Sequence, residues 1–388
     1  MMPTLPRICH PKAVEKVAVP VERLLALSIY PNVGIKTLNQ LLDAHLEFPS
    51  STWNAQWLRK MSIKQAPLAR VISDGVIPED LLRKAQGWIL ETQKIGARIV
   101  TRVDSEYPQM LLHIYEAPPF LWLRGNPEVL KMPLLSVVGT RRPTHTAVRE
   151  TKRIVEDCAR LGLGIVSGLA HGIDQVAHRA ALDGGGVTIA VFGSGINRVY
   201  PSQHRALAKE MLQQGGLHIS EFPPGAPPAK HHFVKRNRII SGLSRACLLG
   251  QSALKGGSMI TQSYVKEQDR DFYAIPYAPS EPQSGGSLYA LRDGATLTRS
   301  AKDILSESYK EILTDHECTS VDSSSATIHA PTLLQTEILR RCQSTPVSID
   351  VLMQAMPNQR SEVLYALIEL EWHRRIKRLP GDQYIRHE

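Results

Sequence analysis

Cysteine is scarce in this sequence and long apolar runs are absent, and both shortages narrow the class of protein. The five cysteines are scattered over 388 residues, and none are spaced as C-x-x-C. This excludes a disulfide framework and the common zinc-knuckle spacing, and it fits a reducing compartment. The sequence contains no run of about 18 apolar residues, so no membrane span is expected. The first 20 residues also lack the apolar centre of a signal peptide. We therefore expect a cytoplasmic protein with no membrane partner.

The sequence also lacks the signatures of common nucleotide-binding enzymes. The Walker A pattern G-x-x-x-x-G-K-[ST] does not occur, and Gly193-Ser194-Gly195 begins a dinucleotide fingerprint whose third glycine is replaced by Arg198. Asp174 and His178 share one face of a predicted helix, but no third ligand or nucleophile accompanies them. Helix capping and packing explain this pair better than acid–base or metal chemistry. We expect no catalytic residue, no metal and no cofactor.

Positive charge is what the chain has in excess. Lys and Arg number 46 against 37 Asp and Glu, and the formal net charge is +9. A basic balance favours a polyanionic partner such as nucleic acid, although a solvated basic surface explains it too. The length predicts two or three domains, each with ample core.

The apolar pattern divides the chain into folded regions joined by polar segments. Residues 1–20 form an N-terminal extension, and residues 21–96 predict a small helical domain similar to SAM or helix-hairpin-helix modules. Residues 97–315 alternate between short apolar runs and helical stretches. Residues 316–331 have the Ser-rich composition of a linker. Residues 332–388 predict three helices followed by a hairpin, which is the layout of a winged helix.

Six short apolar runs, each bounded by Gly, Ser or Pro, predict the strands of the central region. They are Leu134–Val138, Gly164–Val166, Val187–Phe192, Leu217–Ile219, Ala246–Leu249 and Phe272–Ile275. Helical stretches lie between most of them, so the pattern predicts an α/β fold with an extended Rossmann-like, doubly wound parallel sheet. Ligands of such sheets bind at the carboxyl ends of the strands.

Glycine loops follow several of these predicted strands. The segments are Gly139-Thr140-Arg141-Arg142, Ser167-Gly168 with His171 close behind, and Gly257-Ser258. A glycine at the start of a helix lets backbone N–H groups approach an anion, and two arginines hold phosphate oxygens in a fork. Several such loops on one edge suit a ligand with more than one phosphate. The alternative is a surface loop with incidental arginines.

The most informative run is Lys230–Gly242, which is basic, contains no acidic residue and carries a single aromatic, Phe233. Basic residues track a phosphate backbone while an aromatic ring stacks on a base. The run therefore favours a single-stranded nucleic acid. A solvated charged face is the alternative.

The motifs together resemble those of the DprA/Smf family of DNA-processing proteins. The motifs are Gly139–Pro143, Ser167–His178, Tyr200-Pro201, Phe233–Ser244, Gly257–Thr261 and Glu267-Gln268. The resemblance spans about residues 97–305, and the helical start and winged-helix-like tail are similar to modules of many members. It implies a non-enzymatic protein of natural transformation that binds single-stranded DNA, forms a homodimer and helps load the recombinase RecA. The predicted DNA site consists of Gly139, Thr140, Arg141, Arg142, Ser167, Gly168, His171, Phe233, Lys235, Arg236, Asn237, Arg238, Gly257 and Ser258.

The sequence departs from the family pattern near the predicted sheet edge. His171 stands where Arg is usual, Gln251 where Glu is usual, and Asp269 and Tyr277 each stand where Gly is usual. These changes are typical of a divergent member with altered specificity, for example one carried on a mobile element.

Two other functions remain open. A phosphoribohydrolase-like enzyme on this fold needs P-G-G-x-G-T-x-x-E, and the corresponding Lys255–Ser263 has no Glu to act as an acid or base. A regulator would bind duplex DNA through the tail. The third tail helix carries Glu362, Glu369 and Glu371, so the basic cluster Arg374–Arg378 is the better contact for phosphates. A protein-interaction role for the tail fits equally well.

Overall fold

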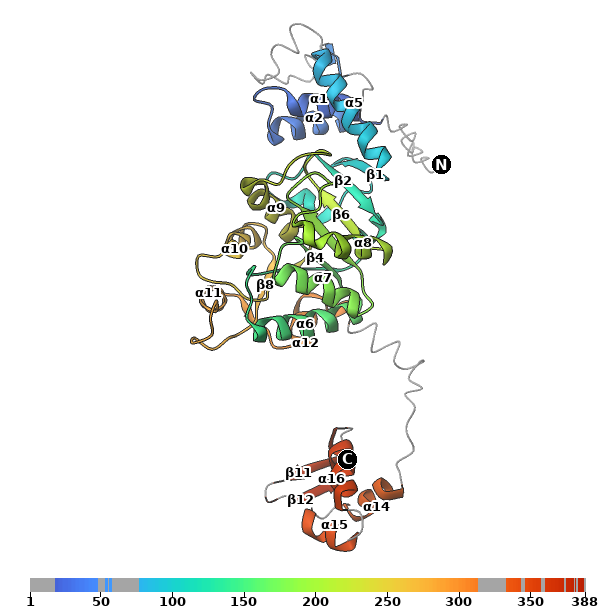
Figure 1. Ribbon diagram of the computed structural model, residues 1–388, viewed down its shortest axis with the longest axis vertical. Helices are drawn as coiled ribbons and strands as arrows, with labels where there is room; N and C mark the ends of the chain where they lie inside the picture. The colour runs from blue at the N-terminus through green and yellow to red at the C-terminus, as the bar shows by residue number, and fades with distance from the viewer. Residues whose placement is uncertain are drawn as a thin grey trace, which may run out of the picture. The chain divides into compact units, whose positions relative to one another are not determined.

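The computed structural model in Figure 1 divides into two compact units, Met1–Leu313 and Thr314–Glu388. The structure describes residues 18–47, 53–54, 56–57, 77–312, 333–342, 346–356, 360–372, 375–379, 381 and 383–386. The predicted linker 316–331, residues 1–17 of the predicted extension, Arg374 and the side chain of Glu369 lie outside the described residues. Among the described residues, no helix is both long enough and apolar enough to cross a membrane.

A nine-stranded sheet in the order β1-β2-β6-β5-β4-β3-β7-β8-β9 forms the centre of the first unit. Its strands are β1 (Ala97–Thr101), β2 (Phe120–Gly125), β3 (Leu134–Val138), β4 (Gly164–Ser167), β5 (Thr188–Phe192), β6 (Leu217–Ser220), β7 (Ala246–Leu249), β8 (Asp271–Ala274) and β9 (Thr296–Leu297). All pairs from β6 to β9 are parallel, which confirms the predicted parallel sheet and its six strands. The antiparallel pairs β1–β2 and β2–β6, and the short strand β9, extend this sheet beyond the prediction.

The chain reverses its direction across the sheet between β3 and β7. From β3 it proceeds through β4 and β5 to β6, and it then crosses back to β7, β8 and β9. A crevice opens at such a switch point, outside the carboxyl ends of the two central strands. The loops that follow β3 and β7 therefore occupy the position where open α/β sheets bind their ligands.

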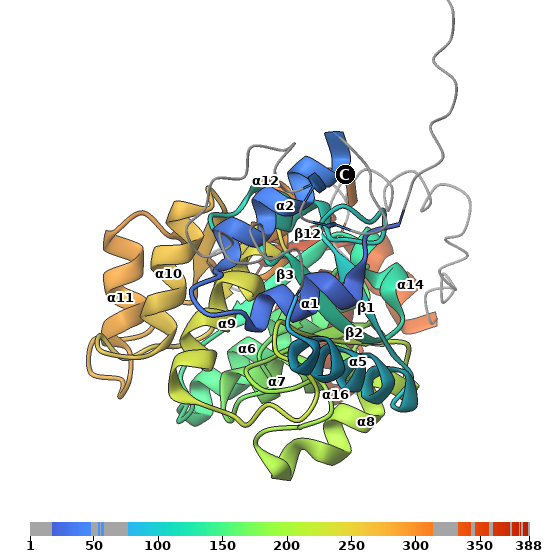
Figure 2. The same cartoon turned by 90° about the horizontal axis from the view of Figure 1, so that it is seen from above.

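Helices cover both faces of the sheet because its strands alternate two sets of apolar side chains. In β3, Leu135 and Val137 join the core under α6 (His145–Arg160), α7 (Ile173–Asp183) and α12 (Ala301–Ser308), whereas Leu134 and Val138 join the core on the other face. That other face carries α9 (Lys230–Gly242), α10 (Ser258–Glu267) and α11 (Gly285–Arg292), which lie side by side in Figures 1 and 2. The helix α8 (Arg205–Gln213) packs on Phe192 at the end of β5.

The N-terminal helices extend the first unit over the antiparallel edge of the sheet. They are α1 (Val21–Ile29), α2 (Ile35–Glu47) and α5 (Glu79–Lys94). Their apolar core includes Trp122 of β2, whose indole N–H donates to the Thr92 hydroxyl of α5 at 3.0 Å. These helices therefore cover strands of the central sheet as well as each other.

The second unit has the predicted order of three helices and a hairpin. Its elements are α14 (Leu333–Arg341), β10 (Val347–Ser348), α15 (Ile349–Ala355), α16 (Arg360–Trp372), β11 (Ile376–Leu379) and β12 (Gln383–Arg386). Val363, Leu367 and Leu370 of α16 are buried, as their spacing predicts. The Ser348 hydroxyl accepts from the Val351 N–H at 3.4 Å and caps α15. The strand β12 pairs antiparallel with both β10 and β11, which makes a small three-stranded sheet.

Candidate nucleic-acid interface

A cavity of about 620 Å³ lies at the switch point, between the loops that follow β3 and β7 and the helices α9 and α10. Nine of the predicted site residues line it: Gly139, Thr140, Arg141, Arg142, Phe233, Arg236, Asn237, Gly257 and Ser258. The fold therefore brings together segments separated by more than a hundred positions in the sequence, at the edge where the sheet pattern predicts a ligand.

Phe233 presents a half-buried ring to this cavity, with two arginines close to it. The Cζ atoms of Arg141 and Arg236 lie 5.7 Å and 5.9 Å from the ring centroid, which is cation–π range. The ring packs against Gly193, where a Cβ atom would lie 2.6 Å from Phe233 Cδ1. A side chain at position 193 would push the ring away, so this glycine fixes the position of Phe233.

Arg236 lines the cavity as a buried residue, and its predicted phosphate contact stays a prediction. Its Nη1 donates to the carbonyl oxygens of Gly168, at 2.6 Å, and of Val191. The residue is only 3% exposed. Burial lowers the pKa of the guanidinium to about 10, while the nearby Asp174 carboxylate opposes that shift. Arg236 thus remains protonated at neutral pH and forms part of the cavity wall.

Arg238 and Lys235, which are also predicted DNA contacts, do not line this cavity. Arg238 Nη2 pairs with Glu221 Oε1 at 2.5 Å, and the two side chains are 4% and 6% exposed. Lys235 is 40% exposed and its Nζ lies 3.6 Å from Glu221 Oε2. At 3.6 residues per turn, positions 235 and 238 are rotated by about 200° and 140° from position 233. They therefore project from a different side of α9 than Phe233.

Three predicted residues of the loop after β4 lie outside the cavity lining. The buried Ser167 hydroxyl donates to the Val137 carbonyl at 2.6 Å, and Gly168 uses its carbonyl for Arg236. His171 is exposed, and its ring meets His204 edge-on at 4.8 Å. These residues support the cavity wall or lie beside it, so their predicted DNA contacts stay predictions without geometric support.

The loop after β3 carries the exposed cations of the cavity, Arg141 and Arg142. It is held in place by the loop after β7, since the Thr140 N–H donates to the Gln251 carbonyl at 2.7 Å. The Gln251 side chain accepts from the Thr144 N–H at 3.0 Å and donates to the Pro282 carbonyl at 3.1 Å. Gln251, one of the departures from the family pattern, thus joins three backbone segments around the cavity.

The helix α10 begins at the opposite wall with Gly257 and Ser258. The Ser258 hydroxyl is 2.7 Å from the Ser252 hydroxyl, which anchors the first turn of the helix to the loop after β7. No neighbouring atom lies within 4 Å of where a Cβ of Gly257 would be, so its backbone is open to an approaching ligand. A helix start of this kind favours anions.

Asp174 and His178 behave as packing residues. Burial raises the pKa of Asp174, and the Arg236 guanidinium opposes that shift. His178 is completely buried; its Nε2 accepts from the Leu169 N–H at 3.2 Å and its Nδ1 is 2.7 Å from the Thr188 hydroxyl. Nε2 thus holds the loop after β4, and Nδ1 joins the ring to the start of β5.

Residues outside the predicted set also line the cavity. Tyr200 is 48% exposed and its ring centroid lies 5.4 Å from that of Phe233, so the two rings form one aromatic surface. The motif Tyr200-Pro201 was the sequence signal that could have identified it. Lys230 adds an exposed cation at the start of α9, and Gln283 joins the lining without any local pattern that marks it.

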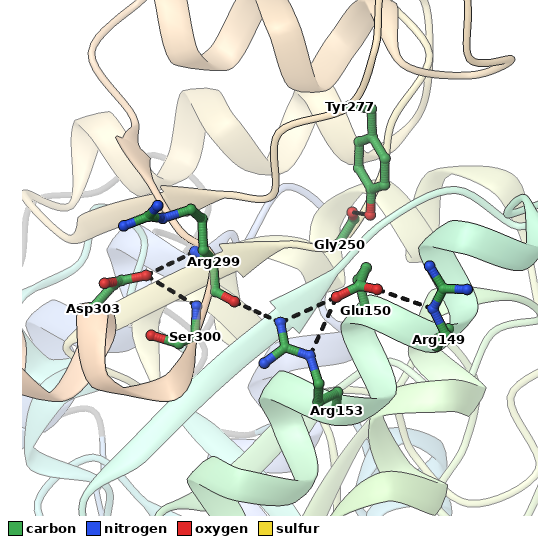
Figure 3. Close-up of polar contacts among 8 residues, drawn as sticks. All are labelled: Arg149, Glu150, Arg153, Gly250, Tyr277, Arg299, Ser300 and Asp303. Atoms are coloured by element: carbon green, nitrogen blue, oxygen red, sulfur yellow. Dashed lines mark hydrogen bonds and ion pairs between the residues drawn. The ribbon is translucent and has the colours of Figure 1, made fainter. Parts of the chain in front are cut away.

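Tyr277, another departure from the family pattern, stabilises the sheet behind the cavity. Figure 3 shows its hydroxyl donating to the Gly250 carbonyl, 2.5 Å away, in the turn that follows β7. In the same view Arg153 of α6 joins Glu150 to the backbone of Arg299. Burial raises the pKa of the Tyr277 phenol. The hydrogen bond of Tyr277 therefore holds the loop that carries Gln251. Tyr277 is not among the residues that line the cavity.

This chain is similar to known proteins over most of its length. The family described as DNA recombination-mediator protein A matches residues 98–309, and the DprA winged helix domain matches residues 323–382. Protein Smf of Escherichia coli (strain K12) is 36% identical over 289 residues, which cover 73% of this chain and 76% of that protein. DNA processing protein DprA of Streptococcus pneumoniae is 39% identical over 205 residues, 53% of this chain and 72% of that protein.

Two solved structures share this architecture. DNA processing protein A from Streptococcus pneumoniae superposes with a TM-score of 0.61 at 29% identity, covering 74% of this chain and 97% of that one. DNA processing protein A from Helicobacter pylori, described by its single-stranded DNA binding mode, gives a TM-score of 0.50 at 26% identity. It covers 56% of this chain and 96% of that one.

Proposed function

The chain belongs to the DNA recombination-mediator protein A family, with a role in DNA processing and recombination, and we propose that it binds single-stranded DNA in the cavity beside α9. The observation that carries this proposal is the position of Phe233, whose ring lines the cavity within cation–π range of the guanidinium groups of Arg141 and Arg236. A base stacks on such a ring while exposed cations neutralise the adjoining phosphates. The Helicobacter pylori relative, described as binding single-stranded DNA, supports the same ligand.

The geometry favours a single strand over a duplex. Phe233 is half-buried inside a cavity, so only a base that leaves its stack can reach the face of the ring. Arg141, Arg142 and Lys230 are exposed around it, where the phosphates of such a strand would pass. A regular duplex keeps its bases stacked and would reach only these cations.

We propose that the cavity binds its ligand without chemical reaction. Its carboxylate, Asp174, is buried and accepts from the Ala170 N–H at 3.4 Å. Ser263 occupies the position at which the phosphoribohydrolase pattern needs its Glu. Incubation with AMP, ATP or oligonucleotides should release no product above that of a Gln251→Ala variant. Product release well above that level would favour the phosphoribohydrolase-like enzyme.

We further propose that the protein acts in the cytoplasm as a homodimer that protects incoming strands in natural transformation and helps load RecA. The family assignment supports these partners. Tyr289 and Leu297 are each 49% exposed in α11 and in the last strand of the sheet, and they offer apolar surface for self-association. Sedimentation of the full chain and of a Leu297→Asp variant tests the dimer. RecA filament formation on coated DNA tests loading.

The second unit supports a further candidate, duplex binding through its hairpin. Arg375, Lys377 and Arg386 are exposed on or next to β11 and β12, whereas α16 exposes Glu362 and Glu371. Phosphates would therefore meet the hairpin rather than the helix. A full-length Lys377→Glu variant should lose duplex affinity and keep single-strand affinity. If the wild-type protein and the Lys377→Glu variant bind the duplex equally well, the tail is better explained by a protein-interaction role.

The experiment that tests the main proposal is a set of binding titrations with a labelled oligothymidine, its duplex form and free nucleotides at several salt concentrations. Tight, salt-sensitive binding of the single strand, with weaker binding of the duplex, is the expected result. Equal binding of both forms would mean that the cations act without the ring, and the proposed role of the cavity would be wrong.

A further inference from the structure

A second cavity, of about 420 Å³, lies beside α9 and shares Val234 with the first. Its lining includes Lys235 and Arg238, the two cations of α9 that do not line the first cavity. The other polar and aromatic side chains of its lining are Tyr115, Glu116, His231, Tyr264, Glu267 and Gln268. The two cavities thus meet at a single exposed residue, and a strand that leaves the first can cross α9 into the second.

Polar atoms in the wall of this second cavity have no partner within the described part of the chain. Arg238 uses Nη2 for Glu221, but its Nε and Nη1 make no hydrogen bond. Gln268 donates its Nε2 to the Arg238 carbonyl at 2.9 Å, whereas its Oε1 has no donor. Both side chains are more than nine-tenths buried. These three atoms have almost no accessible surface, so a ligand that supplies both kinds of group reaches them once the Arg238 and Gln268 side chains turn toward the cavity.

The charges of this cavity favour a base over a phosphate. Glu267 and Glu116 line it, and two carboxylates repel a phosphate while they accept N–H groups. Tyr115 is 81% exposed at the same cavity and offers a ring for stacking. Lys235, which is 40% exposed, can neutralise the phosphate of the nucleotide outside. The chemistry therefore corresponds to a nucleotide whose base enters and whose backbone stays at the rim.

We propose that the second cavity binds one base of the same strand and selects guanine; this rests on the proposed single-strand function. Guanine presents two adjacent N–H donors, N1 and N2, next to its O6 acceptor. The donors match the exposed Glu267 carboxylate and, once the buried side chains turn toward the cavity, Gln268 Oε1, while O6 and N7 match the donors of Arg238. Adenine has no carbonyl, thymine has a single N–H, and cytosine lacks adjacent N–H donors on two ring positions. The first cavity stacks any base, and the second would give the protein a preference.

The test compares two short oligonucleotides, an oligothymidine and the same oligothymidine with one central guanine, on the full-length protein. The readout is the ratio of the two affinities. A substitution that changes the net charge of the protein alters both affinities by the same factor, so it leaves this ratio unchanged. The wild-type protein should bind the guanine oligonucleotide about fivefold or more tightly, the lower end of the discrimination of one good base contact. Glu267→Gln should bring the ratio close to one. Glu128→Gln, which removes an exposed carboxylate outside both cavities, should leave it unchanged.

Tyr115→Ala is a second variant that leaves the buried residues intact, since this side chain is almost fully exposed. It should lower the affinity for the guanine oligonucleotide more than that for oligothymidine. A wild-type ratio of one would overturn the guanine pocket while leaving the single-strand function in place. So would a preference that survives in both Glu267→Gln and Tyr115→Ala. Failure to bind oligothymidine at all would instead contradict the proposed function itself.

Discussion

The guanidinium of Arg236 fills the space that a side chain at position 168 would need. A Cβ atom on Gly168 would lie 2.1 Å from Arg236 Nη1, and that same Nη1 donates to the Gly168 carbonyl at 2.6 Å. The loop after β4 and the helix α9 are therefore joined through one buried cation, which lies directly under the ring that we assign to base stacking.

The first prediction concerns this buried cation. Arg236→Ala should lower the free energy of unfolding by about 2–5 kcal/mol, because it removes charge-assisted hydrogen bonds to two carbonyls and empties the space of a buried side chain. Urea denaturation measures the change. Lys235→Ala is the matched control on the same helix; its Nζ is 3.6 Å from Glu221 and its own side chain is 40% exposed, so we expect a loss within about 1 kcal/mol.

One outcome would favour the sequence-based prediction that Arg236 contacts a phosphate of the DNA. If Arg236→Ala unfolds at the wild-type urea concentration but binds DNA with a weaker salt dependence, Arg236 contacts a phosphate and does not stabilise the fold.

The second prediction concerns pH and follows from His178. Thr188 donates its hydroxyl to the Ile165 carbonyl, so His178 Nδ1–H donates to Thr188 while Nε2 accepts from Leu169. Burial lowers the pKa of His178 to about 3, well below its unfolded value of about 6.5. As the pH falls below about 6.5 the unfolded state takes up the proton first, so the fold loses stability between that pH and about pH 3.

Melting temperatures between pH 7 and pH 4 measure this loss. His178→Asn should be less stable than wild type at pH 7 but should lose less on acidification. His171→Asn, a change at an exposed ring, should keep the wild-type pH dependence. An unchanged slope in His178→Asn would mean that other groups, such as the buried His218 with its pKa of about 4, dominate.

The third prediction concerns the second unit. A chain truncated after Leu313 keeps the whole of the first unit, including every residue that lines the cavity. It should fold with the same cooperative transition and bind oligothymidine within a few-fold of the full chain. Aggregation of the truncated chain, or loss of nearly all affinity, would show that the tail forms part of the main site.

The fourth prediction separates phosphate contacts from other cations. Each phosphate neutralised on a single strand adds about 0.7 to the slope of log affinity against log salt. Arg141→Ala should therefore flatten that slope by roughly this amount. Arg149→Ala removes an equally exposed cation outside the cavity and should leave the slope unchanged. A slope that falls equally in both variants would indicate diffuse attraction by net charge.

The sequence predicted most of the central sheet because parallel strands covered on both faces are continuous apolar runs. Leu134–Val138 and Thr188–Phe192 are buried at every position. The strand β1 escaped detection because only Val100 and Thr101 of its five residues are buried. The strand β1 joins the sheet by pairing with β2, and its own sequence of apolar and polar residues does not predict that pairing.

The site was predicted only in part, because charge in a sequence does not reveal burial. Arg236 and Arg238 are as basic as Arg141, yet their partners Gly168 and Glu221 are distant in the sequence. Helical spacing alone would have separated Lys235 from Phe233, since residues two apart point to different sides of a helix. No local signal could have revealed the carbonyl oxygens that hold Arg236.

The measurement that tests the central claim most directly is the affinity of Phe233→Ala for a short oligothymidine at several salt concentrations. Loss of the ring should cost roughly 1–3 kcal/mol at every salt concentration while the salt slope stays that of wild type, because stacking involves no counterions. Phe233→Trp should retain most of the affinity. If Phe233→Ala binds like wild type at every salt concentration, the strand does not stack in this cavity, and the proposed site is wrong.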